Sequence, residues 1–156
     1  MFFVRFISVV PVFLLFFSTT ALAQFPIIDS TQLKTWMTGK SKAVLIDSRT
    51  HEEYVQAHIP GAVSIPADQM RVKESVLPRD KSAPLIFYCR GLGCTLSRMA
   101  ADDAVAMGYT YLMIYQAGMP DWLLQGNPVQ KGEKPGTVKQ KSKSKEGSNG
   151  HEKGKS

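Results

Sequence analysis

The chain has 156 residues, 44% of them apolar and 10% aromatic, which suits one ordinary globular domain. Its formal net charge of +6 is uneven: residues 24–130 contain ten basic and ten acidic side chains, whereas residues 131–156 contain eight lysines and three glutamates. A neutral central segment argues against a basic nucleic-acid-binding domain, so no nucleic-acid partner is expected, and two cysteines are too few for a disulfide-stabilised scaffold.

Residues 1–23 have the features of a cleavable signal peptide. Arg5 is followed by an apolar run from Phe6 to Phe17, and Ala21-Leu22-Ala23 provides the small residues that precede a cleavage site. The run is shorter than the roughly 20 residues that a spanning helix needs. We therefore expect cleavage after Ala23 and export to the periplasm, where disulfides can form. An uncleaved membrane anchor is the alternative.

Helix and strand patterns alternate between Pro26 and Val129. The expected helices are a helix that Ser30 caps and Gly39 ends, and helices at 51–57, 68–77, 95–107 and 120–125; the expected strands are 43–46, 62–65, 85–88 and 111–115. The helix at 95–107 presents one apolar face, formed by Leu96, Met99, Ala100, Ala104 and Met107. Because the strands are apolar on both faces, we expect an α/β fold with a central parallel sheet and helices on both faces.

Residues 131–156 predict a disordered, lysine-rich tail. Val138 is its one aliphatic residue, so the segment cannot bury enough surface to offset the entropy of ordering. Weak contact with anionic membranes, at about 1 kcal/mol per lysine, is one interpretation of the tail. A solvated tail that aids solubility is the simpler one, because no apolar side chain accompanies the lysines.

The segment from Cys89 to Thr95 connects an expected strand to an expected helix. Gly91 and Gly93 allow a tight turn with inward N–H groups, and the helix adds its positive N-terminal end. This predicts an anion site, to which Arg90 adds charge, and a lowered pKa for Cys89. Asp47-Ser48-Arg49 follows another strand, and ligands of such sheets bind at these carboxyl ends. A buried cysteine with glycines that serve only the turn is the alternative.

Residue spacing excludes several other kinds of site. A dinucleotide fingerprint needs glycine where Leu96 stands, a P-loop needs Gly-Lys followed by Ser or Thr, and a thioredoxin-like motif has two residues between its cysteines where this chain has four. A cysteine phosphatase needs arginine where Thr95 stands. No metal site is expected, because the candidate ligands lack paired spacing; these are Cys89, Cys94, His51 and His58.

The domain resembles the single-domain rhodaneses, a family of sulfurtransferases. The matching stretches lie in order between residues 28 and 129: Leu45-Ile46-Asp47-Ser48-Arg49, Glu52-Glu53-Tyr54, Ala57-His58-Ile59-Pro60-Gly61-Ala62, Phe87-Tyr88-Cys89-Arg90-Gly91, Gly108-Tyr109 and Ala117-Gly118-Met119-Pro120-Asp121-Trp122. The sequence departs from the usual family pattern at Ala57 and Ala117, where glycine is typical. Its Cys-x4-Cys loop resembles one subgroup of the family.

The resemblance implies a rhodanese-like α/β fold and a persulfide on Cys89. By position, the substrate-binding loop contains Arg90, Gly91, Leu92, Gly93, Cys94 and Thr95. Asp47 and Arg49 match a largely structural Asp-x-Arg pair that supports the loop. The implied reaction moves sulfane sulfur from thiosulfate, or a similar anionic donor, to cyanide or a thiol acceptor. It requires no cofactor, and we expect a monomer.

Two other functions stay open at this point. One is a periplasmic thiol–disulfide oxidoreductase that uses Cys89 and Cys94, and the other is a non-catalytic rhodanese-like binding module. A six-residue loop curled around an anion brings its ends together, so we also expect a reversible Cys89–Cys94 disulfide that inactivates the enzyme. His58, Trp36 and Trp122 are interpreted as packed structural residues.

Overall fold

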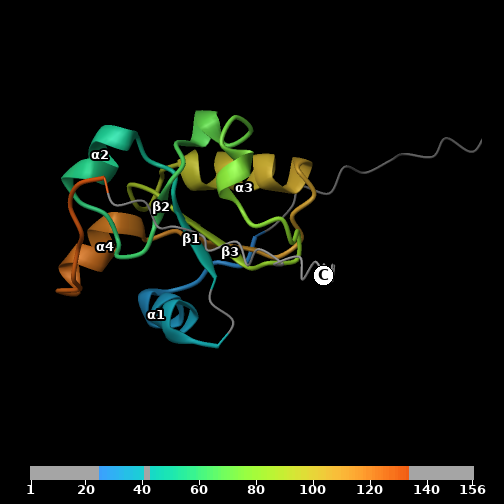
Figure 1. Cartoon of the computed structure of the whole chain (residues 1–156). Helices are drawn as coiled ribbons and strands as arrows, with labels where there is room; N and C mark the ends of the chain where they lie inside the picture. The colour runs from blue at the N-terminus through green and yellow to red at the C-terminus, as the bar shows by residue number, and fades with distance from the viewer. Residues whose placement is uncertain (1–24, 41–42, 134–156) are drawn as a thin grey trace, which may run out of the picture.

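The computed structural model describes residues 25–40 and 43–133, which form a parallel sheet with helices on both faces (Figure 1). The strands are β1 (Val44–Asp47), β2 (Val63–Ser64), β3 (Leu85–Tyr88) and β4 (Leu112–Tyr115), in the spatial order β2-β1-β3-β4. The α-helices are α1 (Ser30–Thr38), α2 (His51–Gln56), α3 (Leu96–Ala106) and α4 (Gly118–Leu124). Two 3-10 turns, η1 (Ala67–Gln69) and η2 (Glu74–Val76), lie between β2 and β3. The expected α/β fold with a central parallel sheet is confirmed.

The strand order places a switch point between β1 and β3. The chain continues from β1 to β2 on one side of the sheet and from β3 to β4 on the other, so the connections after β1 and β3 diverge. Asp47 pairs with Tyr88 across the two strands, and the Ser48 N–H donates to the Tyr88 carbonyl at 3.0 Å. Ser48 and Cys89 therefore start their loops side by side, at the edge where such sheets bind ligands.

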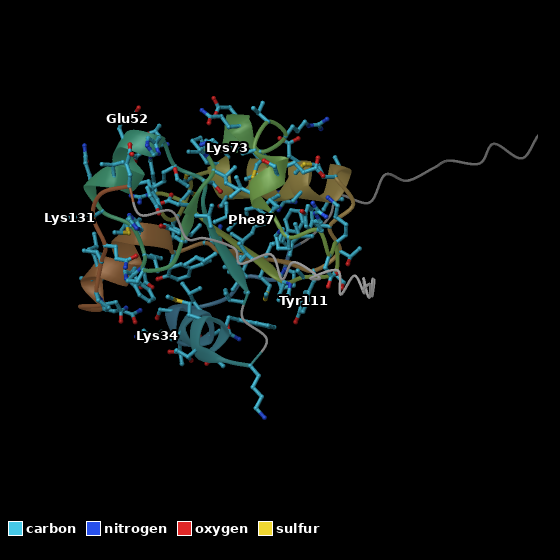
Figure 2. All side chains as sticks on the ribbon, viewed as in Figure 1. Lys34, Glu52, Lys73, Phe87, Tyr111 and Lys131 are labelled. Carbon is cyan, nitrogen blue, oxygen red and sulfur yellow. The ribbon has the colours of Figure 1, made fainter. Side chains whose placement is uncertain are left out.

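Alternate residues of each strand pack into two separate cores. Leu85 and Phe87 of β3 face one side, which α3 and η1 cover, whereas Ile86 and Tyr88 face the side that α1, α2 and α4 cover (Figure 1). Figure 2 shows Phe87 at the centre of the molecule, whereas Lys34 and Glu52 lie at its periphery. Two-sided burial explains why the strand sequences are continuously apolar.

Helix boundaries differ from the expected ones in three places. Asp29, and not Ser30, caps α1, because its carboxylate accepts from the Gln32 N–H at 2.8 Å while the Gln32 side chain accepts from the Asp29 N–H. The expected helix at 68–77 is instead η1 and η2, with i→i−3 hydrogen bonds; Val72 and Val76 are β-branched and disfavour a regular helix. Helix α4 begins at Gly118, before Pro120, which occupies the first turn, where no intrahelical N–H bond is lost.

The face that α3 buries also differs from the expected one. Met99 is 51% exposed, whereas Ala100 and Ala104 are fully buried as expected. Ser97 lies on the same face and is 2% exposed. The 97, 100, 101, 104 spacing gives a face of small residues, which lets α3 lie close to the sheet.

The described chain extends past the expected start of the tail at Lys131. The Gly132 N–H donates to the Val55 carbonyl at 2.8 Å, and Glu133 lies 3.3 Å from the imidazole of His51. The domain boundary after Gln130 stays a prediction. The expected signal peptide at residues 1–23 and residues 134–156 of the expected tail lie outside the described residues. No helix within the described part of the chain is long and apolar enough to cross a bilayer.

Candidate active site

Cys89 directly follows β3 and is 1% exposed. Its carbonyl accepts from the Met119 N–H at 3.0 Å, which ties the start of the loop to α4. Gly118 makes this approach possible: it has φ +62°, and a Cβ there would collide with the Cys89 carbonyl and lie 2.7 Å from the Gly91 nitrogen. The position of the predicted nucleophile therefore depends on a glycine 29 residues further along the chain.

The loop after Cys89 turns back on itself. Gly91 and Gly93 have φ values of +105° and +83°, a region that favours glycine, as the sequence predicts. The Cys94 N–H donates to the Gly91 carbonyl at 3.1 Å, so this amide closes a turn within the loop. Leu92 is 82% exposed at the tip, and its side chain adds nothing to the interior of the loop.

The sulfur of Cys89 has two close polar neighbours. It lies 3.3 Å from Ser97 Oγ, and the thiol donates to the Cys94 carbonyl at 3.6 Å. Burial, together with the hydrogen bond to the Cys94 side chain, raises the pKa of Cys89, and the bond to Ser97 only partly opposes this. The expectation that the loop lowers the pKa of Cys89 is wrong for the resting dithiol, because desolvation outweighs the loop's donors.

Cys94 carries the more acidic of the two thiols. Burial alone would raise the pKa of Cys94, but the Cys89 thiol, the N–H groups of Arg90 and Leu96 and the Arg90 charge together lower it. Cys94 is partly exposed, and it lines a cavity of 200 Å³ together with Thr95 and Ser97. The Thr95 hydroxyl lies 3.9 Å from Met99 Sδ. The loop's donors therefore stabilise the thiolate of Cys94, the more accessible sulfur.

The charge of Arg90 is paired within the domain. Its guanidinium makes a two-pronged ion pair with Glu53 of α2, at 2.8 and 2.6 Å. The pairing with Arg90 is the largest cause that lowers the pKa of Glu53 to about 2. Glu53 also closes the capping box of α2 with Thr50. The arginine beside the nucleophile is thus anchored to a neighbouring helix, which the sequence analysis did not anticipate.

Asp47, Arg49 and Tyr88 form a buried network directly beneath the loop. The Arg49 guanidinium donates to both Asp47 oxygens, at 3.0 and 2.6 Å, and the Tyr88 hydroxyl donates to Asp47 at 2.6 Å. Burial would lower the pKa of Arg49, but its bonds to Asp47 outweigh burial and raise it; burial and Asp47 raise the pKa of Tyr88. The network ties β1 to the residue that precedes Cys89.

Ser97 is the residue at this site that sequence reasoning missed. The expected apolar face of this helix does not include it, because serine is polar. Its 97, 100, 101, 104 spacing with three alanines was the signal that could have placed it on the buried face. A buried hydroxyl on that face needs a polar partner, and Ser97 Oγ has one in the Cys89 sulfur at 3.3 Å.

Comparisons with known proteins identify the family of this domain. A model of the rhodanese-like domain family matches residues 29–125. The chain belongs to the rhodanese-like domain family. A sulfurtransferase from Allochromatium vinosum is 28% identical over 102 residues, which are 65% of this chain and 92% of that protein. An HTH-type transcriptional regulator from Mycobacterium tuberculosis is 35% identical over 91 residues, but this chain spans only 39% of the regulator's length.

Solved structures share the rhodanese-like fold. A human single-domain sulfurtransferase has a TM-score of 0.55 at 24% identity, over 65% of this chain and 98% of that one. A thiosulfate sulfurtransferase from Pseudomonas aeruginosa has a TM-score of 0.61 at 23% identity, over 70% of this chain and 21% of that one. At this identity the likeness establishes the fold.

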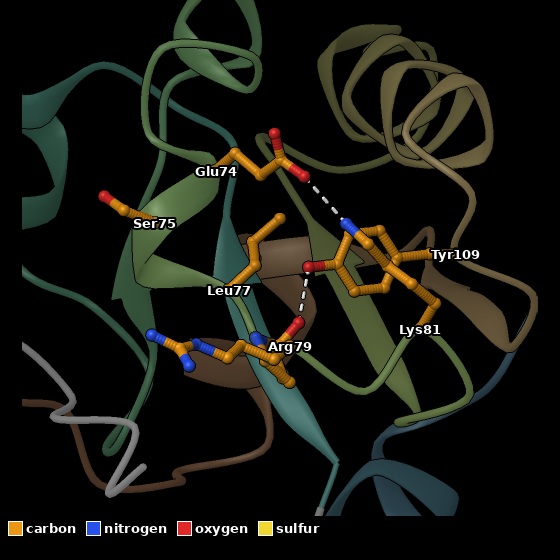
Figure 3. Close-up of a pocket in the computed structure, with 7 residues that line it drawn as sticks. Glu74, Ser75, Leu77, Arg79, Lys81 and Tyr109 are labelled. Carbon is orange, nitrogen blue, oxygen red and sulfur yellow. Dashed lines mark hydrogen bonds and ion pairs between the residues drawn. The ribbon is translucent and has the colours of Figure 1, made fainter.

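A larger cavity of this rhodanese-like domain, of 430 Å³, lies at the opposite edge of the sheet (Figure 3). Its residues precede β3 and β4, whereas Cys89 follows β3. The side chains in Figure 3 bind one another: Lys81 lies 2.7 Å from Glu74 and 4.0 Å from the centre of the Tyr109 ring, and the Tyr109 hydroxyl donates to the Pro78 carbonyl at 2.6 Å. These contacts hold the segment between η2 and β3 and are remote from the two cysteines.

His58 and Trp122 are packed in the interior of the domain. His58 is fully buried, stacks on the Tyr54 ring at 3.7 Å and lies 2.8 Å from the Tyr54 carbonyl through Nδ1. Trp122 is 2% exposed and donates to the Pro128 carbonyl at 2.8 Å. Within residues 25–40 and 43–133, no group of three His, Cys, Asp or Glu side chains is arranged to hold a metal ion.

Proposed function

We propose that this chain is an exported sulfurtransferase of the Cys-x4-Cys subgroup, which moves sulfane sulfur from thiosulfate or a similar anionic donor to cyanide or a thiol. The observation that carries the proposal is the position of Cys89: it follows the central strand β3, in a glycine-rich loop that leads into α3. Family membership and the Allochromatium sulfurtransferase support the reaction class.

The reaction has two steps. The Cys89 thiolate attacks the outer sulfur of thiosulfate, the S–S bond of the donor breaks, and sulfite leaves with the bonding pair. Cys89 is left as a persulfide. A thiol or cyanide acceptor then attacks the outer sulfur of the persulfide and removes it, which returns the Cys89 thiolate.

Cys94 is the group in the loop that accepts the proton of the Cys89 thiol. When Cys94 is ionised, the Cys89 thiol donates toward the Cys94 thiolate, which the loop stabilises. Transfer of that proton to Cys94 frees the Cys89 sulfur for attack, and Ser97 Oγ at 3.3 Å can then donate to the new thiolate. The raised pKa of Cys89 is thus compatible with its role as nucleophile.

Mass spectrometry after incubation with thiosulfate tests the proposal. Trypsin cuts after Lys81, Arg90 and Arg98, so Cys89 and Cys94 fall in separate peptides, 82–90 and 91–98. In the Cys94→Ser variant, where only Cys89 can react, we expect a gain of about 32 Da on the first peptide, absent when Cys89 is also replaced by serine. A Cys94→Ser protein that gains no sulfur from thiosulfate would contradict the proposal. N-terminal sequencing of the exported protein tests cleavage after Ala23.

The interaction of the two cysteines favours a second candidate, a thiol–disulfide oxidoreductase. Two thiols in one short loop, of which the one with the lowered pKa is the readier nucleophile, suit disulfide exchange. This function predicts a loss of about 2 Da in wild type on incubation with a disulfide donor, and no sulfur gain from thiosulfate in Cys94→Ser. The thiosulfate spectrum of Cys94→Ser therefore separates the two candidates.

A further inference from the structure

The loop holds the second cysteine against the sulfur of the first. Two glycines with positive φ and the turn closed by the Cys94 N–H fold the loop back, so that the Cys94 carbonyl lies 3.6 Å from the Cys89 sulfur. The Cys89 thiol also interacts with the Cys94 side chain. An intramolecular acceptor is therefore already in place when Cys89 becomes loaded with sulfur.

Access from outside favours Cys94 over Cys89. The 200 Å³ cavity beside the loop is lined by Cys94 and Ser97, whereas Cys89 is 1% exposed. Any external molecule, thiosulfate included, reaches the Cys89 sulfur only past the residues that bury it. Cys94 meets no such barrier, and the loop's N–H groups and Arg90 favour its thiolate. For sulfur transfer, proximity of this kind can outweigh a modest difference in the reactivity of two thiols.

We propose that Cys94 discharges the Cys89 persulfide: its sulfur attacks Cys89 Sγ, the outer sulfur leaves as hydrosulfide, and a Cys89–Cys94 disulfide forms. This inference rests on the proposed sulfurtransferase function. The Cys94 thiolate supplies the electron pair of the new S–S bond, and the outer sulfur takes the pair of the broken one. The sulfane sulfur is reduced to sulfide while the two cysteines are oxidised to a disulfide.

Protons and electrons balance over the two reaction steps, the loading of Cys89 and its discharge by Cys94. Two thiols and one thiosulfate give one disulfide, one hydrogen sulfite and one hydrosulfide. The proton that Cys94 takes from Cys89 in the first step passes to the outer sulfur and leaves with it, and the proton that Cys94 lost on ionising is taken up by the sulfite. A dithiol reductant restores the two thiols by exchange at the disulfide. The expected disulfide is then a product of each turnover and not only a switch for inactivation.

Single-turnover loading tests the inference. The fully reduced chain is mixed with limiting thiosulfate under anaerobic conditions, without cyanide or external thiol, and then alkylated and digested. We expect wild type to release about one equivalent of sulfide per loaded chain and to yield peptides 82–90 and 91–98 joined by a disulfide. In Cys94→Ser the added sulfur stays on peptide 82–90 and no sulfide appears. The experiment compares, between wild type and Cys94→Ser, the fraction of loaded sulfur that is released as sulfide. A change in the rate of loading does not affect this fraction.

Three other outcomes would contradict either the role of Cys94 or the proposed function. Equal persulfide retention and no excess sulfide in wild type would overturn the role of Cys94. The same holds if the added sulfur is found on peptide 91–98, because Cys94 would then relay the sulfur rather than expel it. If Cys94→Ser gains no sulfur, and wild type neither releases sulfide nor forms the disulfide, the proposed function is overturned, and the inference with it. If Cys94→Ser has a lower melting temperature than wild type, Cys94→Ala repeats the test. A wild-type sample without thiosulfate is the control for disulfide formation by adventitious oxidation.

Discussion

The hydroxyl of Ser97 lies 3.3 Å from the sulfur of Cys89, and both atoms are buried between α3 and the end of β3. Of the neighbours of Cys89, Ser97 is the one that lowers its pKa, through its side chain and its backbone N–H. Ser97 is therefore a positioning residue that stabilises the thiolate form of the nucleophile.

Ser97→Ala should slow persulfide formation about tenfold near neutral pH, which corresponds to the loss of one hydrogen bond to a charged group. The pH at which loading reaches half its maximal rate should move upward, because the remaining causes raise the pKa of Cys89. Stopped-flow loading over a pH series measures both effects. Ser48→Ala is the matched control: that serine is 1% exposed, and its hydroxyl has no hydrogen-bond partner among the described residues. Equal effects of the two substitutions would show that Ser97 acts only through packing.

Limiting iodoacetamide should modify Cys94 before Cys89. Cys94 is the more exposed sulfur, and its lowered pKa gives it the larger thiolate fraction at neutral pH. The label should therefore appear on peptide 91–98 well before peptide 82–90. In Cys94→Ser, modification of Cys89 should stay slow and require higher pH. Earlier labelling of Cys89 in wild type would reverse the assignment of the two acidities.

Glu53→Gln should lower KM for thiosulfate, and Arg90→Ala should raise it, each by about two- to fivefold, the range of an exposed ion pair. Glu53 neutralises the guanidinium beside the loop, so its removal leaves a positive charge for the anionic donor. Glutamine keeps the capping box of α2, which makes the substitution mild. Steady-state kinetics at low and high salt provide the measurement, since added salt should reduce both effects. A KM that neither substitution changes would exclude Arg90 from donor binding.

Acid should remove the contribution of the Glu53–Arg90 pair to stability. The pKa of Glu53 is lowered to about 2 in the folded chain, so the pair stabilises the fold above the ordinary glutamate pKa and loses this effect as the pH falls toward 2. The difference in free energy of unfolding between wild type and Glu53→Gln should be constant above about pH 5 and vanish near pH 2. Urea unfolding across this range measures it, and a pH-independent difference would contradict the pairing.

Gly118→Ala should destabilise the domain much more than Gly126→Ala. Both glycines have positive φ, +62° and +68°, so each alanine costs about 1–2 kcal/mol in backbone strain. Only at Gly118 does the added Cβ meet the backbone of Cys89 and Gly91, whereas nothing lies within 4 Å at Gly126. Thermal unfolding should show the larger loss at Gly118, together with slower sulfur loading. Equal melting temperatures would mean that the loop can move away from α4.

The sequence pattern predicted the strands and the glycine turn, because these features depend mainly on residues close together in the chain. Continuous apolar runs gave the correct positions of β1 and β3, and Gly91 and Gly93 indicated the turn, because each depends on the residue's own burial or backbone freedom. The pairing of Arg90 with Glu53 was not predicted, since 37 residues separate them and only the parallel pairing of β1 with β3 brings α2 to the loop. The pKa of Cys89 was mispredicted for the same reason: the depth of burial is set by α3 and α4, not by the loop.

β1 and β3 are the two central strands of the sheet. Both strands have a neighbour on each side, so their amide protons should exchange with deuterium only when the whole domain unfolds. Cys89 stands one residue beyond this most protected segment, whereas residues 90–94 can open locally. Amide exchange in the loop should therefore differ among the dithiol, persulfide and disulfide forms while the strand amides stay slow in all three. The two central strands act as an internal reference against which each chemical state of the loop can be timed in one sample.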